Sequence, residues 1–205
     1  MGLISDVGEV SLDSFLPDGF IKDLPIVGPA FSIVKISKDI RDRIFVEKMK
    51  SFIEHIDKNQ KWREKFHDEE ECKKISKQLL YIVDSCDDDE KLKLIGVAFN
   101  HFVKEEISKE EYFFTVNIIS KSFYSFLKIL LKIDEDNVRF VNDDTKYDYV
   151  GIKHLLNIGA LDFDGQVSAG FDSQTGKMKS HPFEIVTLNE YGKFLRDLLI
   201  EMNKL

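Results

Sequence analysis

Apolar residues recur every three or four positions through most of the chain before residue 132. This spacing matches the turn of an α-helix, about 3.6 residues, and predicts amphipathic helices rather than strands. The first such stretch follows Pro29 and continues to Asn59, which predicts one long helix over residues 29–59. The apolar residues expected on its buried face are Ile33, Ile36, Ile40, Ile44, Met49, Phe52, Ile53 and Ile56.

Three further helices are expected before residue 132. One covers residues 60–85 and carries a polar middle that can divide it in two. The next begins at the acidic run 87–89, which supplies an N-cap and negative charge for its first turn. The last begins with a capping box of Ser108 and Glu111. Because it is apolar on nearly every side as far as Leu131, we expect it to be the centre of the helical core.

The pattern changes after an acidic loop at 134–144. Thr187 and Glu190 are interpreted as a second capping box, at the start of the final helix. Turn residues and apolar runs predict a helix, a β-hairpin and another helix. The predicted elements are a helix over 145–158, strands over 160–163 and 183–186 around a glycine-bearing tip at 165–176, and a helix that ends at Met202.

These patterns predict a mainly α protein, with an N-terminal bundle of about four helices and a C-terminal helix, β-hairpin and helix module. The predicted divisions are an apolar arm over 1–28, the bundle over 29–136 and the module over 145–205. Two arrangements are compatible with the sequence: the module packs with the bundle as one unit, or the two form separate units. A chain of 205 residues is long enough for one good core or two small ones.

Composition and charge exclude some classes of protein. The chain is 43% hydrophobic with 17 Phe, enough for a large buried core, while 32% charged residues exclude a membrane-integral protein. The formal net charge of −8 repels a phosphate backbone, so nucleic acid is a disfavoured partner.

The sequence also bears on location. Residues 1–15 lack the basic start of a secretory signal, and the apolar run 24–34 is shorter than the roughly 20 residues needed to cross a bilayer. Cys72 and Cys86 have the spacing of neither a redox pair nor a zinc clip. We expect a reducing compartment, the cytoplasm.

The N-terminal arm is the clearest candidate for a binding segment, because prolines and apolar residues alternate there ahead of the long helix. One interpretation is that the arm folds back and covers the core. The other is that its apolar side chains enter the groove of a partner or lie at a lipid surface. The predicted partner-binding residues are Phe20, Ile26, Val27 and Phe31.

No catalytic, cofactor or metal site can be assembled from sequence motifs. No histidine has a second ligand at helical spacing, and the acidic loop lacks the glycine and glutamate of a calcium loop. The stretch 165–170 lacks the pattern of a phosphate-binding loop, and no G-x-S-x-G elbow occurs. We therefore predict a protein that is not an enzyme, with no cofactor and no metal.

The C-terminal part resembles the wing and last helix of winged-helix proteins. Residues 155–161, LLNIGAL, are similar to the end of a recognition helix that runs into the first wing strand, and 187–192, TLNEYG, to the closing junction. The resemblance covers about sixty residues and implies Lys177 and Lys179 as candidate nucleic-acid contacts. The helix segment itself is rich in aspartate, which favours a protein partner over DNA.

The middle of the chain resembles helical domains of the tellurite-resistance family through residues 105–111, EEISKEE. That family accompanies bacterial stress and phage-defence systems, which implies the same setting here. We therefore predict a cytoplasmic, bacterial protein-interaction or accessory protein of such a system. The alternatives are a winged-helix transcriptional regulator and a peripheral membrane protein anchored by the arm.

Overall fold

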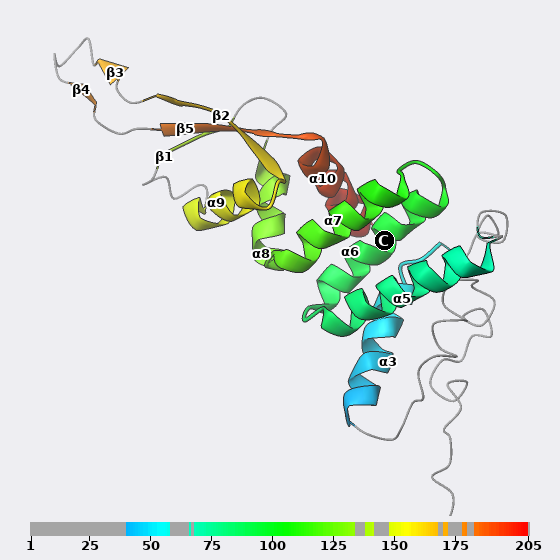
Figure 1. The fold of residues 1–205 in the computed structure, drawn as a ribbon. Coiled ribbons are helices and arrows are strands. Elements are labelled where there is room, and N and C mark those ends of the chain that lie inside the picture. The colour runs from blue at the N-terminus through cyan, green and yellow to red at the C-terminus, as the bar shows by residue number, and fades with distance from the viewer. Residues whose placement is uncertain are drawn as a thin grey trace, which may run out of the picture. The chain divides into compact units, whose positions relative to one another are not determined.

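The protein is mainly helical with a small antiparallel sheet, as the sequence predicts (Figure 1). The residues group into two compact units, Met1–Ile107 and Ser108–Leu205. The predicted bundle included residues 109–132, which the structure groups with the C-terminal elements; the boundaries at 28, 136 and 145 stay a prediction. The computed structural model describes residues 40–57, 66, 68–133, 138–141, 148–167, 170–171, 178–179 and 183–204.

In the first unit, α3 packs against both of the other described helices. The rings of Phe52 and Phe99 lie 5.9 Å apart between α3 and α6. The two helices approach closely at Gly96, where an added Cβ would stand 2.5 Å from the carbonyl oxygen of Phe52. A side chain there would force the helices apart. The helices of this unit are α3 (Ile40–Ile53), α5 (Glu69–Ser85) and α6 (Asp89–Val103).

A buried amide ties α6 to the chain that leaves α3. Asn100 is 7% exposed. Its Oδ1 accepts a hydrogen bond from the backbone N–H of Asp57 at 2.7 Å, and its Nδ2 donates to the carbonyl of His55 at 2.8 Å. One side chain thus satisfies two backbone groups where the chain turns out of α3.

Polar side chains start the other two helices of this unit. Asp68 accepts hydrogen bonds from the backbone N–H groups of Glu70 and Glu71, so the polar middle of the predicted helix over 60–85 is the start of α5. Asp88 caps α6 in the same way, which confirms the predicted role of the acidic run. The neighbouring Asp87 pairs with Lys91 at 2.7 Å, and this hydrogen bond lowers the pKa of the Asp87 carboxyl.

The buried face predicted for the first helix is partly wrong. Ile44 was expected inside but is 52% exposed, whereas Phe45 and Val46 are buried. Successive residues of a helix differ in direction by about 100°, so a face centred on Phe45, Met49 and Phe52 turns Ile44 outward. The described helix also ends at Ile53, before the predicted end at 59.

The prediction of one unbroken helix from Ser108 to Leu131 is wrong. The chain forms α7 (Lys109–Lys121) and then α8 (Tyr124–Leu127) followed by the 3₁₀ helix η2 (Lys128–Lys132), with a bend of 115° between the two parts. Ser122 and Phe123 have extended backbones at the corner. The Ser122 hydroxyl donates to the carbonyl of Ile118 at 2.8 Å, which occupies an acceptor at the end of α7.

The start of α7 is the predicted capping box. The Glu111 carboxylate accepts from the backbone N–H of Ser108 at 2.6 Å, and the Ser108 hydroxyl accepts from the backbone N–H of Glu111 at 3.1 Å. The hydrogen bond from Ser108 lowers the pKa of Glu111.

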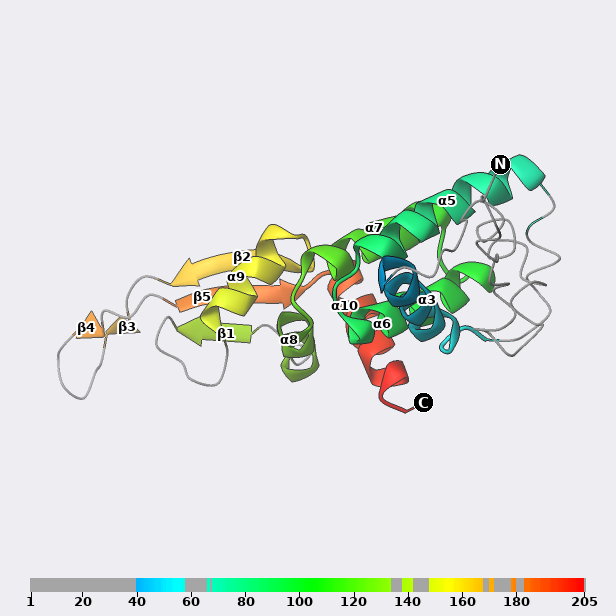
Figure 2. The same ribbon diagram turned by 90° about the horizontal axis from the view of Figure 1, so that it is seen from below.

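The second unit contains a three-stranded antiparallel sheet in the order β1–β5–β2, with α9 packed against β2 (Figure 2). The outer strand β1 was not predicted, because its short run of apolar and basic residues has no hairpin partner nearby in the sequence. The hairpin continues beyond a bulge near Phe163 into a small pair, β3–β4. The strands are β1 (Val138–Val141), β2 (Leu161–Val167), β3 (Gly170–Phe171), β4 (Met178–Lys179) and β5 (Phe183–Leu188).

Two helices flank these strands in the chain, α9 (Tyr149–Asn157) and α10 (Glu190–Met202). The capping box predicted at Thr187 is wrong, since Thr187 lies in β5 and Asn189 caps α10. The Asn189 Oδ1 accepts from the backbone N–H of Gly192 at 2.9 Å, and its Nδ2 donates to the carbonyl of Gly159 at 2.9 Å. This amide therefore joins the start of α10 to the turn before β2.

We expect Asn100→Ala to lower the free energy of unfolding by about 2 kcal/mol, because the substitution leaves a backbone donor and an acceptor without their partner. Chemical denaturation measures the loss, and Asn157→Ala at an exposed amide is the control. Equal stability of the two variants would show that the Asn100 hydrogen bonds contribute nothing net.

A second prediction concerns pH. The carboxylate of Glu111 has a folded-state pKa below its ordinary value of 4.5, so its contribution to stability is present above that value and is lost as the pH falls through the folded pKa. Wild type should exceed Glu111→Gln in stability near neutral pH, and the difference should vanish in strong acid. Glu110→Gln, in the same turn, is the control; a constant difference at all pH values would contradict the prediction.

Candidate partner-binding surface

The structure describes little of the predicted site. Phe20, Ile26, Val27, Phe31 and Lys177 lie outside the described residues. The backbone of Lys179 lies in β4, paired with Gly170. The roles of these residues therefore stay predictions, and the candidate surface below is built from others.

The helix that follows the described part of β1 places one face inward and leaves another open. Asp148 caps α9 by accepting from the backbone N–H of Gly151 at 3.1 Å. Gly151, Ile152 and Leu155 are buried, and an added Cβ at Gly151 would collide with the side chains of Phe126 and Ile129. Contact with α8 and η2 therefore fixes which side of α9 faces solvent.

The outward side of α9 is apolar at its centre. Val150 is 65% exposed, and His154 lies one turn further along the same face. Lys153, the lysine of this helix, is paired with Glu184 of β5, and its ammonium lies 5.6 Å from the centre of the Tyr149 ring. The cation is therefore already engaged with the unit's own sheet.

Phe123 continues this surface from the corner between α7 and α8. Its side chain is 66% exposed. The ring meets Phe126 edge-on at 5.4 Å between centroids and lies 6.4 Å from the His154 ring, which is itself 5.4 Å from Phe126. We call Phe123, Phe126, Val150 and His154 the aromatic surface.

Phe123 occupies an unusual position for an apolar residue. It is the N-cap of α8, where its side chain makes no capping hydrogen bond. Ser, Thr, Asp and Asn are preferred at this position because their oxygens accept from free backbone N–H groups. The Phe123 side chain thus gives no acceptor to the helix it begins and remains largely in solvent, so the site is a candidate for binding.

The ring of His154 is held by aromatic contacts. Its Nε2 atom is buried and has no hydrogen-bond partner among the residues that the structure describes. The imidazole therefore packs against both Phe123 and Phe126.

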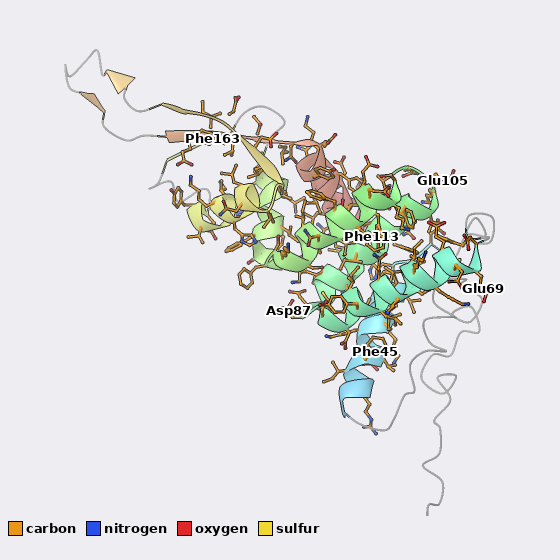
Figure 3. The ribbon with its side chains drawn as sticks, viewed as in Figure 1. Phe45, Glu69, Asp87, Glu105, Phe113 and Phe163 are labelled. Carbon is orange, nitrogen blue, oxygen red and sulfur yellow. The ribbon has the colours of Figure 1, made fainter. Side chains whose placement is uncertain are left out.

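A second exposed aromatic residue lies on the hairpin. Phe163 of β2 is 55% exposed and is labelled in Figure 3. It pairs across the strands with the fully buried Val186, so it shares a sheet face with a core residue but stands on the edge strand. The bulge beside it breaks the regular edge.

The remaining ionisable groups do not gather into a reaction centre within the described part. Burial raises the pKa of the thiols of Cys72 and Cys86, which are free and buried. Burial is the largest cause for Cys86, and the negative charge of Asp87 also raises the pKa of this thiol. No group of three or more metal-ligating side chains occurs among the described residues.

Neither the length and apolarity of the described helices nor similarity to known proteins points to a function. Within the described ranges no single helix is long and apolar enough to cross a membrane, while the bent pair of α7 with α8 and η2 meets that test only when both parts are counted together. No protein-family model matches the chain, and no curated protein or solved structure shows significant similarity to it.

The aromatic surface was missed by sequence reasoning because Phe123 and Phe126 were assigned to the core of one unbroken helix. The sequence nevertheless contains features that distinguish the segment around Phe123. The sequence has no acidic residue from Tyr112 to Ile133 but has lysines on both sides of Phe123, and Ser122 precedes the break.

We expect Phe123→Ser to leave the free energy of unfolding unchanged or to raise it by up to about 1 kcal/mol, because a serine at the N-cap can accept from the backbone of α8. Leu127→Ala, one turn later at a fully buried position, should lower it by about 3 kcal/mol. Thermal and chemical denaturation test both. A large loss from Phe123→Ser would instead make Phe123 part of the core.

Proposed function

We propose that the protein acts by binding a protein partner through the aromatic surface and is not an enzyme. The observation that carries this proposal is the exposure of Phe123 and Val150, the first of which stands at a helix start where its side chain makes no capping hydrogen bond. Large apolar side chains exposed together on a folded unit are typical of interaction sites, and aromatic residues are frequent among the side chains that dominate binding.

The chemistry of the described ionisable groups also favours binding over catalysis. The pKa shifts resolved among the described residues belong to acidic groups at helix starts, such as Asp87 and Glu111, to lysines paired with glutamates, and to the buried thiols and the buried Tyr112 hydroxyl. Catalytic sites instead bring several perturbed groups together in one cleft. The cytoplasmic location and the association with bacterial stress or phage defence are part of the proposal and rest on the sequence.

A winged-helix-like module is the second part of the proposal. Support comes from the element order β1, α9, β2, hairpin tip, β5 and α10 and from the sheet order β1–β5–β2, in which the strand before the helix pairs with the strand after the wing. Between β1 and β2 the described chain has α9, whereas a helix-turn-helix pairs two helices. The strand pairing is the stronger part of this likeness.

The same likeness favours a winged-helix regulator as the alternative function. A DNA-reading helix presents Arg, Lys, Asn or Gln to the groove. The open side of α9 instead presents Val150 and His154 near its centre, with Asn157 at its end, and Lys153 is paired with Glu184. We therefore favour a protein partner for this face.

The two functions are separated by paired experiments on the full-length chain. Affinity capture from the source cells should retain one partner with wild type and with Tyr81→Ser, a control at a position that is 76% exposed, and lose it with Val150→Arg. A charged side chain at the centre of an apolar contact is expected to weaken binding at least tenfold. Equal recovery with Val150→Arg would contradict the proposal.

The second experiment measures binding to duplex DNA. We expect no mobility shift at low salt; a shift that disappears in the Lys177→Glu, Lys179→Glu variant would favour the regulator instead.

A further inference from the structure

We propose that the aromatic surface accepts a peptide segment in which an apolar anchor is flanked by acidic residues. The inference rests on the proposed function and adds the chemistry of the partner. Three features carry it: the preorganised ring of Phe123, the local positive charge around it and the engagement of the nearby acidic groups.

The ring of Phe123 is held in place before any partner arrives. Extended backbone at Ser122 and Phe123 and the hydrogen bond from Ser122 to Ile118 define the corner. Contacts with Phe126 and His154 support one side of the ring, while 66% of the residue remains exposed. A supported ring loses little conformational entropy on binding, which suits it to anchor an apolar side chain of a partner.

The sequence segment that contains this ring has a charge opposite in sign to that of the whole chain. The net charge of the protein is −8, yet the segment from Tyr112 to Ile133 contains no acidic residue. Lys121 precedes the corner and Lys128 and Lys132 follow it, all exposed. Within the described part these three lysines form no ion pair, and the Lys128 ammonium lies 5.2 Å from the centre of the Tyr124 ring. They are thus available to carboxylates of a partner.

Two acidic groups of the same unit are engaged by groups of the protein itself. Asp148 accepts from the backbone of Gly151 at the start of α9, and Glu184 is paired with Lys153. The surface therefore offers apolar contact at Phe123 and Val150 together with the positive charge of the three exposed lysines of the corner segment. Complementary charge steers association and discriminates against basic partners.

A protein segment fits this surface better than a nucleic acid or a lipid surface. The aliphatic Val150 gives a base no ring to stack on, and His154 and Phe126 already pack around Phe123. A lipid surface would need several apolar side chains that project together, whereas Phe126 is partly buried against Gly151.

The test begins with a random peptide library displayed on phage and selected on the full-length protein, with Phe123→Ser for counter-selection. We expect the enriched peptides to combine Leu, Phe or Trp with Asp or Glu. The best peptide is then compared by fluorescence anisotropy with a version in which Asn and Gln replace its acidic residues. The acidic peptide should bind at least tenfold more tightly, and added salt should reduce the difference.

Protein variants separate charge from apolar contact. A triple variant that combines Lys121→Glu, Lys128→Glu and Lys132→Glu should bind the acidic peptide at least tenfold more weakly than wild type. The control is a triple variant with Lys74→Glu, Lys77→Glu and Lys193→Glu, which has the same net charge as the first triple variant. Its three positions are exposed and lie on other helices, so the substitutions should change peptide binding little. Equal loss in both triple variants would show that only overall charge matters and would overturn the inference.

The outcomes also distinguish this inference from the proposed function. Phe123-dependent peptides without an acidic excess would overturn the partner chemistry and leave the proposed function intact. Absence of any Phe123-dependent peptide would overturn the inference, while the capture experiment with Val150→Arg decides the function separately. Phe123-dependent flotation with phosphatidylserine vesicles, or Phe123-dependent binding of a single-stranded oligonucleotide, would assign the surface to another ligand and overturn the inference.

Discussion

The backbone N–H groups at the start of each helix need an acceptor, and this requirement organises much of the described structure. A helix leaves its first N–H groups without partners inside the helix. Five of the helices meet the need with a polar side chain immediately before the first turn: Asp68, Asp88, Ser108, Asp148 and Asn189. These caps determine where each helix begins and hence which of its residues reach the core.

The start of α8 differs from these five. Phe123 stands where they have Asp, Ser or Asn, and its side chain contributes no acceptor. Stability alone would favour a polar residue at that position. A departure from local consistency that leaves a large ring in solvent is typical of positions retained for binding, where some stability is given up for function.

Charged residues are distributed unevenly along the chain. Acidic residues start α5 and α6 of the first unit, where they accept backbone hydrogen bonds or pair with a lysine, as Asp87 does with Lys91. The corner segment of the second unit has lysines and no carboxylates. In a protein of net charge −8, the segment from Tyr112 to Ile133 is therefore locally basic.

The sequence by itself determined the helical class, the acidic cap of α6, the capping box of α7, and the helix, hairpin and helix order of the C-terminal part, because these depend on residues close together in the chain. Tertiary structure decided the bend at Ser122, the burial of Phe45 in place of Ile44, the pairing of β1 with β5 and the exposure of Phe123. Each of these depends on contacts with distant segments: Gly151 against Phe126, Val138 opposite Val186, and Gly96 against Phe52. Apolar periodicity shows that a residue can be buried, but only the packing of other elements determines whether it is.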